Sequence, residues 1–182
     1  MEKSDNYILK GCLNGDRNAQ KALYEKYKVP MFRVCLRYAQ NREEAEDMLQ
    51  DGFIKVFADL KKFRSDGALG GWIRKVMVNT ALMAIRKRKQ LFSSVEIENL
   101  ADHVTTDENI FAEMNAKALT RIIQKLPDGY RVVFNMYVVE GYPHKEIAQK
   151  LDISINTSKS QLSKAKAMLR RILEKVINTD HV

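Results

Sequence analysis

The chain has 182 residues, of which 45% are apolar and 30% charged, with only eight glycines and three prolines, so the composition is that of a globular protein. A surplus of helix formers over β-branched residues favours an all-α fold. No stretch approaches the roughly 18 apolar residues of a membrane span, and the amino terminus lacks the long apolar core of a secretory signal. We therefore expect no membrane insertion and a soluble, cytoplasmic protein.

The formal net charge of +8 is unevenly distributed. Residues 1–90 contain 19 Lys/Arg against 11 Asp/Glu, residues 91–111 contain five acids and no base, and residues 112–182 contain 12 bases against seven acids. This pattern predicts two small helical domains, at 1–90 and 112–178, joined by an acidic, flexible linker at 91–111. The basic blocks favour a polyanionic partner such as nucleic acid, although a solvated charged surface would explain the same counts.

The first block predicts three helices in succession. Residues 16–39 have apolar side chains at helical spacing, with Asp16 as a cap and Pro30 predicting a bend or break near Val29. Residues 42–63 form the next helix, whose acids crowd the first turn. Breaks are expected at 65–67 and at Gly70-Gly71, followed by a helix that runs from Trp72 into the basic cluster at 86–89.

The four successive positive charges at 86–89 lie on a helix that also carries Trp72 and Asn79. This combination is typical of a surface that binds phosphates while neighbouring polar groups contact bases. A solvated helix end would explain the charges equally well. Trp72 by itself is more often part of a core than a base-stacking residue.

Catalytic and metal chemistry is not indicated. The histidines, His103, His144 and His181, have no partners at metal or nucleophile spacing, and there is no glycine-rich phosphate loop. Cys12 and Cys35 lack CxxC spacing and are expected to be reduced thiols. The acids between residues 43 and 51 fit a helix start or a basic protein partner better than a metal. We expect no enzymatic activity, no metal and no cofactor.

The second block predicts short helices on either side of Pro127-Asp128-Gly129, and then a helix-turn-helix: a short helix at 143–151, a turn around Asp152 and a longer helix at 154–176. Such a pair places its second helix in the major groove of DNA. Amides and hydroxyls on that helix suit base edges, and its basic side chains suit phosphates; the two sets are Asn156, Thr157, Ser160 and Gln161, and Lys159, Lys164, Lys166 and Arg170. An ordinary amphipathic surface helix is the alternative.

Three segments, in this order, resemble those of extracytoplasmic-function (ECF) sigma factors, the two-domain branch of the sigma-70 family. EEAEDMLQDGFIKVF, residues 43–57, is similar to the family's polymerase-binding helix, and GWIRKVMVNTALMAIRKRK, residues 71–89, to its -10 helix. The segment LPDGYRVVFNMYVVEGYPHKEIAQKLDISINTSKSQLSKAKAMLRR, residues 126–171, is similar to its -35-reading domain.

The resemblance implies an initiation factor whose partners are core RNA polymerase, promoter DNA and an anti-sigma factor. It implies contacts to polymerase by Asp47, Gln50, Asp51 and Phe53. It implies contacts to the -10 element, including a flipped base, by Phe63, Arg64, Trp72, Asn79, Arg86 and Lys87, together with the loop at 63–71. It implies contacts to the -35 element by Thr157, Lys159, Ser160, Gln161 and Lys164.

Three positions depart from the family pattern and leave the base preference open. Met83 replaces a common acid or amide, Asp152 a common glycine, and Gln161 a common arginine. Aspartate tolerates the left-handed backbone of such a turn, and Gln161 would favour adenine where arginine favours guanine.

Two other functions fit parts of the sequence. One is a conventional helix-turn-helix regulator of a palindromic operator, which replaces no polymerase subunit. The other is a helical interaction protein that sequesters another regulator and whose basic surfaces are incidental. A requirement for core polymerase separates the sigma factor from the first, and failure to bind any promoter favours the second.

Overall fold

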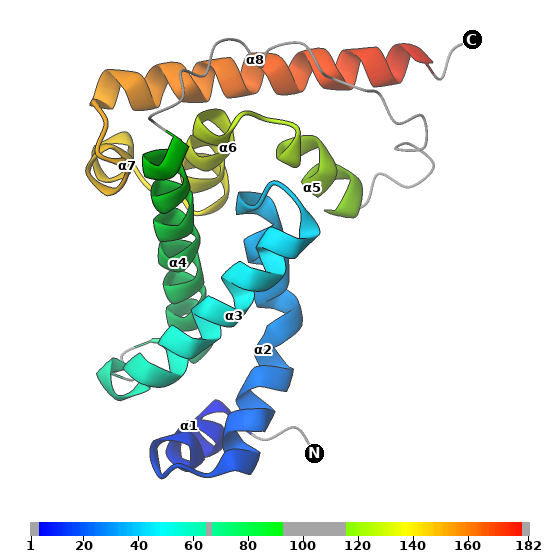
Figure 1. Cartoon of the computed structure of the whole chain (residues 1–182). Helices are drawn as coiled ribbons and strands as arrows, with labels where there is room; N and C mark the ends of the chain where they lie inside the picture. The colour runs from blue at the N-terminus through cyan, green and yellow to red at the C-terminus, as the bar shows by residue number, and fades with distance from the viewer. Residues whose placement is uncertain (1–3, 65–66, 93–115, 180–182) are drawn as a thin grey trace. The chain divides into compact units, whose positions relative to one another are not determined.

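The computed structural model describes residues 4–64, 67–92 and 116–179, with the backbone alone described at 88–92, 116–118 and 175–179. Two compact units are present, residues 1–84 and 85–182, and their division falls inside α4 (Figure 1). All regular structure in the described ranges is helical. This confirms the predicted all-α class with two helical regions.

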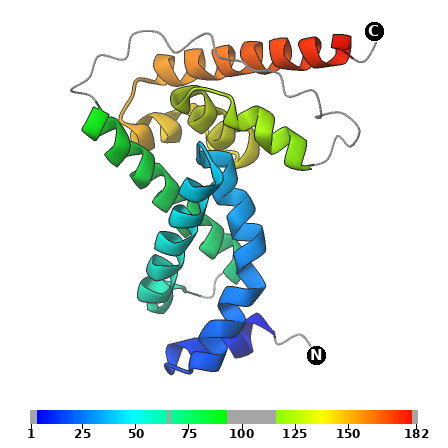
Figure 2. The same ribbon diagram turned by 45° about the vertical axis from the view of Figure 1, so that its right-hand side comes forward.

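The first unit is built on α1 (Asp5–Leu13), α2 (Arg17–Tyr38), α3 (Arg42–Asp59) and the first part of α4 (Leu69–Phe92). α2 packs against both α1 and α3. The colour ramps of Figures 1 and 2 show that α2, α3 and α4 alternate in direction, which short connections require of neighbouring helices. One of these connections is the 3-10 turn η1 (Leu60–Lys62).

Side-chain caps begin the first three helices. Ser4, Asp16 and Asn41 accept hydrogen bonds from the backbone N–H groups of Tyr7, Asn18 and Glu44, respectively. Each cap satisfies a donor that the helix itself leaves unpaired, which is worth about 1 kcal/mol. The predicted capping role of Asp16 is therefore confirmed.

Of the bend or break predicted near Val29, the break does not occur, because α2 continues through Pro30. Pro30 is exposed, whereas Tyr27, Met31 and Val34 on either side of it are buried. Burial of an aliphatic or aromatic side chain contributes about 1.5–3 kcal/mol, so three of them offset the roughly 3 kcal/mol cost of an interior proline.

The break predicted at Gly70-Gly71 is also wrong, since α4 already begins at Leu69. Leu69 is buried, and Gly70 lies against the ring of Tyr27, where an added Cβ would be 3.0 Å from Cε1. The glycine is thus a point of close packing between α4 and α2 and not a helix stop.

The second unit contains α5 (Ala116–Gln124), α6 (Asp128–Phe134), the π-helical turn η2 (Asn135–Val139), α7 (His144–Leu151) and α8 (Ile155–Thr179). α8 packs against α5, α6 and α7. The core cluster of this second unit consists of Ile122, Leu126, Ala165, Leu169 and Ile172. The two predicted short helices are present, but α6 begins at Asp128, inside the break predicted at 127–129, and the π-helical turn had no signal in the sequence.

A buried arginine fixes the turn between α5 and α6. Arg131 is 2% exposed, pairs with Asp128, and donates to the carbonyl oxygens of Leu126 at 2.8 Å and Gln124 at 3.2 Å. A buried guanidinium is tolerated only when its donors are satisfied, and here they close the end of α5.

No helix in the described ranges combines the length and apolarity needed to cross a bilayer. The predicted linker at 91–111 lies outside the described residues, except for its first two positions, which end α4. The domain limits 1–90 and 112–178 stay predictions.

Candidate nucleic-acid interface

The outer face of α3 is acidic with one apolar side chain. Asp47, Gln50, Asp51 and Ile54 are exposed there, and Ile54 is 66% accessible. Spacings of three and four residues place them on one stripe of the helix. A single exposed isoleucine assigns no role by itself, but together with these acids it gives α3 an exposed stripe that is negatively charged around one apolar side chain. Ile54 was not among the residues predicted from the sequence.

Phe53, in contrast, lies in the core. It is 3% exposed and packs edge-on against Tyr24, with ring centroids 4.7 Å apart. The expectation that Phe53 contacts polymerase directly therefore has no support from its position. The motif could not distinguish which of two adjacent apolar residues, Phe53 or Ile54, faces outward.

α3 and α4 approach closely at Gly52. A Cβ built on this glycine would lie 2.1 Å from Sδ of Met77, which is fully buried. Farther along, Nζ of Lys55 lies 3.4 Å from Sδ of Met83. The two helices thus present Lys55 and the outer face of α4 on one continuous surface.

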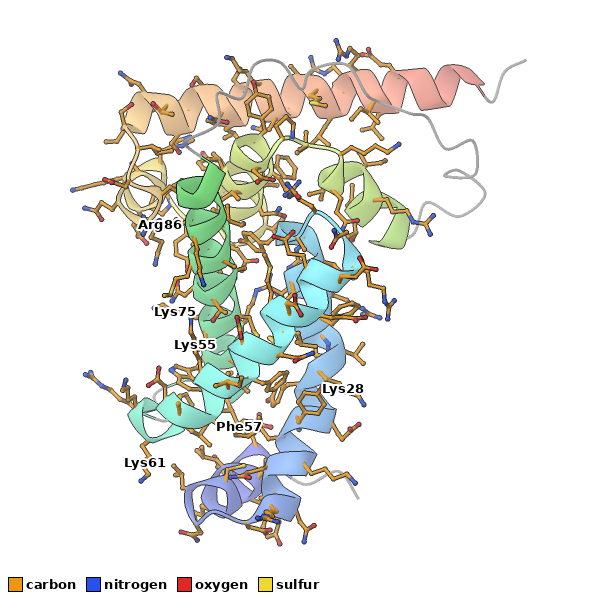
Figure 3. The ribbon with its side chains drawn as sticks, viewed as in Figure 1. Lys28, Lys55, Phe57, Lys61, Lys75 and Arg86 are labelled. Atoms are coloured by element: carbon orange, nitrogen blue, oxygen red, sulfur yellow. The ribbon has the colours of Figure 1, made fainter. Side chains whose placement is uncertain are left out.

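That face of α4 is basic. Lys75, Arg86 and Lys87 are exposed and Asn79 is half-buried, all on α4. Figure 3 labels Lys55, Lys75 and Arg86, which come from α3 and α4, and Lys61, which comes from η1. Lys55, Lys61 and Lys75 were not predicted from the sequence. Lys61 and Lys75 each belong to a pair of basic residues, shorter than the run at 86–89, and only the fold brings Lys55 to α4.

Phe63 and Trp72 connect the two ends of the segment between η1 and α4. Both are half-buried, with ring centroids 5.7 Å apart. Trp72 is therefore neither wholly core nor a free stacking platform. Arg64 is exposed beside Phe63, and residues 65–66 of the predicted base-holding loop lie outside the described residues.

The helix-turn-helix has the predicted order and a left-handed turn. Asp152 adopts φ 55° and ψ 51°, and its backbone N–H bonds to the carbonyl of Ala148. Ser154 caps α8, since its Oγ accepts from the backbone N–H of Thr157 at 2.9 Å. The tolerance of Asp152 for this conformation, predicted from its side chain, is confirmed.

On α8, the side chains of Lys159, Ser160 and Lys164 are exposed and that of Thr157 is half-buried. The Thr157 hydroxyl lies 2.9 Å from that of Ser154, and Ser160 donates to the carbonyl of Thr157 at 3.0 Å. Both hydroxyls keep lone pairs that can accept from a base amino group. Ser163, which was not predicted from the sequence, is exposed next to Lys164.

Gln161 points inward. A Cβ on Gly129 would be 2.8 Å from Oε1 of Gln161, and that oxygen is buried without a hydrogen-bond partner among the described residues. The amide therefore packs α8 against α6. The expectation that Gln161 reads adenine has no support from this geometry.

A buried polar link holds the two helices of the motif together. Ser158 is fully buried, and its Oγ lies 2.9 Å from Nδ1 of His144 at the start of α7. The His144 ring stacks on Tyr137, with centroids 4.5 Å apart. These contacts fix the angle at which α8 is presented.

Groups of three or more histidine, cysteine or acidic side chains able to hold a metal do not occur in the described ranges. Cys12 and Cys35 are free thiols, and both are buried.

Two models of the same protein family match the chain. "Sigma-70 region 2" matches residues 23–90 and "Sigma-70, region 4" matches residues 116–169, so the two account for both described units. The chain belongs to the sigma-70 family. Its curated relatives place this sigma factor in the ECF branch, and they resemble it over nearly their whole lengths.

The ECF RNA polymerase sigma factor SigW of Bacillus subtilis is 25% identical over 95% of this chain and 98% of its own. SigM of Mycobacterium tuberculosis is 27% identical, with 94% and 86% covered. The sigma factor described here thus directs RNA polymerase to promoters, and family membership overturns the regulator and adaptor alternatives.

Solved structures share the fold. A complex of CnrH with the cytosolic domain of CnrY has a TM-score of 0.51 at 17% identity, covering 95% of this sigma factor and 99% of that chain. The sigma factor RpoE bound to the anti-sigma factor NepR, from Bartonella quintana, has a TM-score of 0.52 at 21% identity, covering 85% and 96%.

Proposed function

We propose that three surfaces of this sigma factor divide the work of promoter recognition. The outer face of α3 binds polymerase, the outer face of α4 together with Lys55 binds the -10 element, and α8 reads the -35 duplex. The observation that carries this proposal is the segregation of charge: α3 turns acids outward, whereas the exposed charges of α4 up to Lys87 are all basic.

Polymerase binding rests on Asp47, Gln50, Asp51 and Ile54. The acids complement a basic partner and speed its encounter, and Ile54 supplies the apolar centre that charge alone lacks. Phe53 supports this surface from beneath, through its contact with Tyr24.

At the -10 element, Lys55, Lys75, Arg86 and Lys87 hold phosphates while Asn79 meets a base. Phosphate contacts supply affinity without sequence information, so the amide has to provide the selectivity. Phe63, Arg64 and Trp72 border the loop that receives an unpaired base. Extruding a base costs a few kcal/mol, which stacking and phosphate contacts offset.

At the -35 element, Lys159 and Lys164 contact phosphates while Thr157, Ser160 and Ser163 face base edges. The left-handed turn at Asp152 and the His144–Ser158 contact orient α8 for the major groove. Gln161 acts only by packing α8 on α6.

The test is run-off transcription with purified core polymerase on a genomic fragment library. Wild-type protein is compared with Asp47→Ala/Gln50→Ala, and Glu25→Ala on α2 serves as the matched control for loss of an exposed acid. We expect specific starts with wild type and control and at least a roughly ten-fold loss with the double variant. Equal transcription by all three would reject α3 as the polymerase surface.

We also propose that the protein acts in the cytoplasm and is held inactive by an anti-sigma protein. The two similar structures support this, since RpoE is bound there to the anti-sigma factor NepR and CnrH to the cytosolic domain of CnrY. The check is cross-linking and purification of the tagged chain from its host. A co-purifying protein that is not a polymerase subunit should abolish run-off transcription when added back; its failure to inhibit would contradict the proposal.

A further inference from the structure

Met83 is an apolar side chain on a basic, polar surface. It is 58% exposed, and it is the one large apolar residue so exposed among residues 69–87 of α4. It follows Asn79 by one helical turn and therefore lies on the same face. Single exposed apolar residues are common on proteins, so exposure alone assigns no role.

A second observation is the contact with Lys55 of α3. Its Nζ lies 3.4 Å from Sδ of Met83, so a cation from another helix is held at the thioether. Thioether sulfur is a weak acceptor, so Lys55 occupies the polar atom of the side chain and the rest of this exposed side chain is apolar. The result is an apolar tip with the positive charge of Lys55 beside it, while Lys75 lies about two turns earlier on α4.

The ligand that fits this arrangement is a nucleotide with an apolar group on its base. Cations beside the tip hold the phosphates and the tip meets the base edge; thymine, through its C5 methyl, is the base with an apolar edge. Methionine has no donor for the carbonyl groups of other bases, and its sulfur, a weak acceptor for their amino groups, is already in contact with Lys55. An acid or amide at this position would instead select those polar groups.

We propose that Met83 is a specificity-determining residue that selects a thymine, through its methyl group, next to the base met by Asn79. The inference rests on the proposed role of α4 at the -10 element. Lys55 is a positioning residue, which orients the thioether and also contacts a phosphate.

The experiment removes that methyl group and nothing else. Each thymine of the -10 element in a promoter found by run-off transcription is replaced in turn by deoxyuridine, and binding of the holoenzyme to each template is measured. One replacement is expected to weaken binding about four-fold, since burial of one methyl or methylene group contributes about 0.8 kcal/mol.

The variants assign the effect to Met83. Met83→Ala should bind the thymine and deoxyuridine templates equally, whereas Met83→Leu should keep the preference. Val29→Ala, an exposed apolar residue on α2, is the control and should behave as wild type. Lys55→Ala should weaken binding to both templates and lower the slope of affinity against salt by about one. Because Met83 is exposed, Met83→Ala should keep the wild-type melting temperature.

Two failures are distinguishable. If no promoter is transcribed with core polymerase, the proposed function fails. If promoters are transcribed but the -10 element contains no thymine, or no deoxyuridine effect depends on Met83, the function stands and the inference about Met83 is overturned.

Discussion

Neighbouring residues 53 and 54 have opposite roles because their side chains leave α3 about 100° apart. Phe53 is 3% exposed and Ile54 is 66% exposed. Phe53→Ala should lower the free energy of unfolding by about 3–5 kcal/mol, because it empties part of the core. Ile54→Ala should leave stability within about 0.5 kcal/mol and weaken binding to core polymerase.

Urea unfolding and a competition assay for core polymerase separate the two outcomes. A stable Phe53→Ala variant that loses polymerase affinity would restore the direct contact that the motif suggested. An Ile54→Ala variant with wild-type affinity would remove Ile54 from the interface.

The thiol of Cys35 is protected by burial, which raises its pKa from 9.0 to about 12. In a Cys12→Ala background, modification of Cys35 by a disulfide reagent at pH 8 should be at least roughly a thousand-fold slower in the folded than in the unfolded protein, in proportion to the thiolate fraction. Rapid modification of the folded protein would contradict this burial.

The same shift links Cys35 to stability at alkaline pH. The folded pKa lies above the unfolded one, so the contribution of this group to stability is fully present below pH 9 and is lost as the pH rises through about 12. Replacing Cys35 with alanine should flatten this part of the stability profile.

The crossing of α3 and α4 depends on a glycine as a point of close approach. Gly52→Ala would place a Cβ 2.1 Å from the buried sulfur of Met77, so the helices must separate or Met77 must repack. We expect a loss of about 1–3 kcal/mol in the free energy of unfolding.

Gly71→Ala, in the first turns of α4, is the matched control. A Cβ there meets nothing within 4 Å, so this change should stabilise the protein by about 0.5–1 kcal/mol. Equal effects of the two substitutions in urea unfolding would show that helix propensity, and not packing, governs both sites.

The type and order of seven of the eight α-helices in the described ranges could be predicted from periodicity, and so could the cap at Asp16 and the turn at Asp152. These features depend on residues close in sequence. The first helix, α1, was not predicted. The continuity of α2 and α4 could not be predicted. Pro30 and Gly70 are tolerated because residues beside them are buried, partly against helices that are distant in the sequence.

The candidate sites were predictable in their location and less so in their residues. The motifs placed the candidate residues on α3, α4 and α8, and whether these helices bind polymerase and DNA stays a prediction. Whether Phe53 or Ile54, and Ser160 or Gln161, faces outward depends on the partner that packs behind each helix. The proximity of Lys55 to Met83 depends on how α3 crosses α4, which no local pattern encodes.

At the scale of the whole molecule, the two proposed DNA surfaces lie on different helices of one chain, α4 and α8. Once polymerase holds both units, the second contact becomes intramolecular and gains an effective concentration. A template that retains only one of the two promoter elements should therefore bind the holoenzyme about a hundred-fold or more weakly than the intact promoter. Filter binding at a fixed salt concentration measures this, and equal affinities would mean that a single unit supplies all the specificity.

The contact between Gly129 and Gln161 also constrains how such proteins diverge. A Cβ at position 129 would lie 2.8 Å from Oε1 of Gln161, so a side chain there requires the flexible amide of Gln161 to move. Proteins that diverge from this one are therefore expected to repack residue 161 whenever residue 129 gains a side chain. The proposed base-contacting residues Ser160 and Ser163 are not part of this contact.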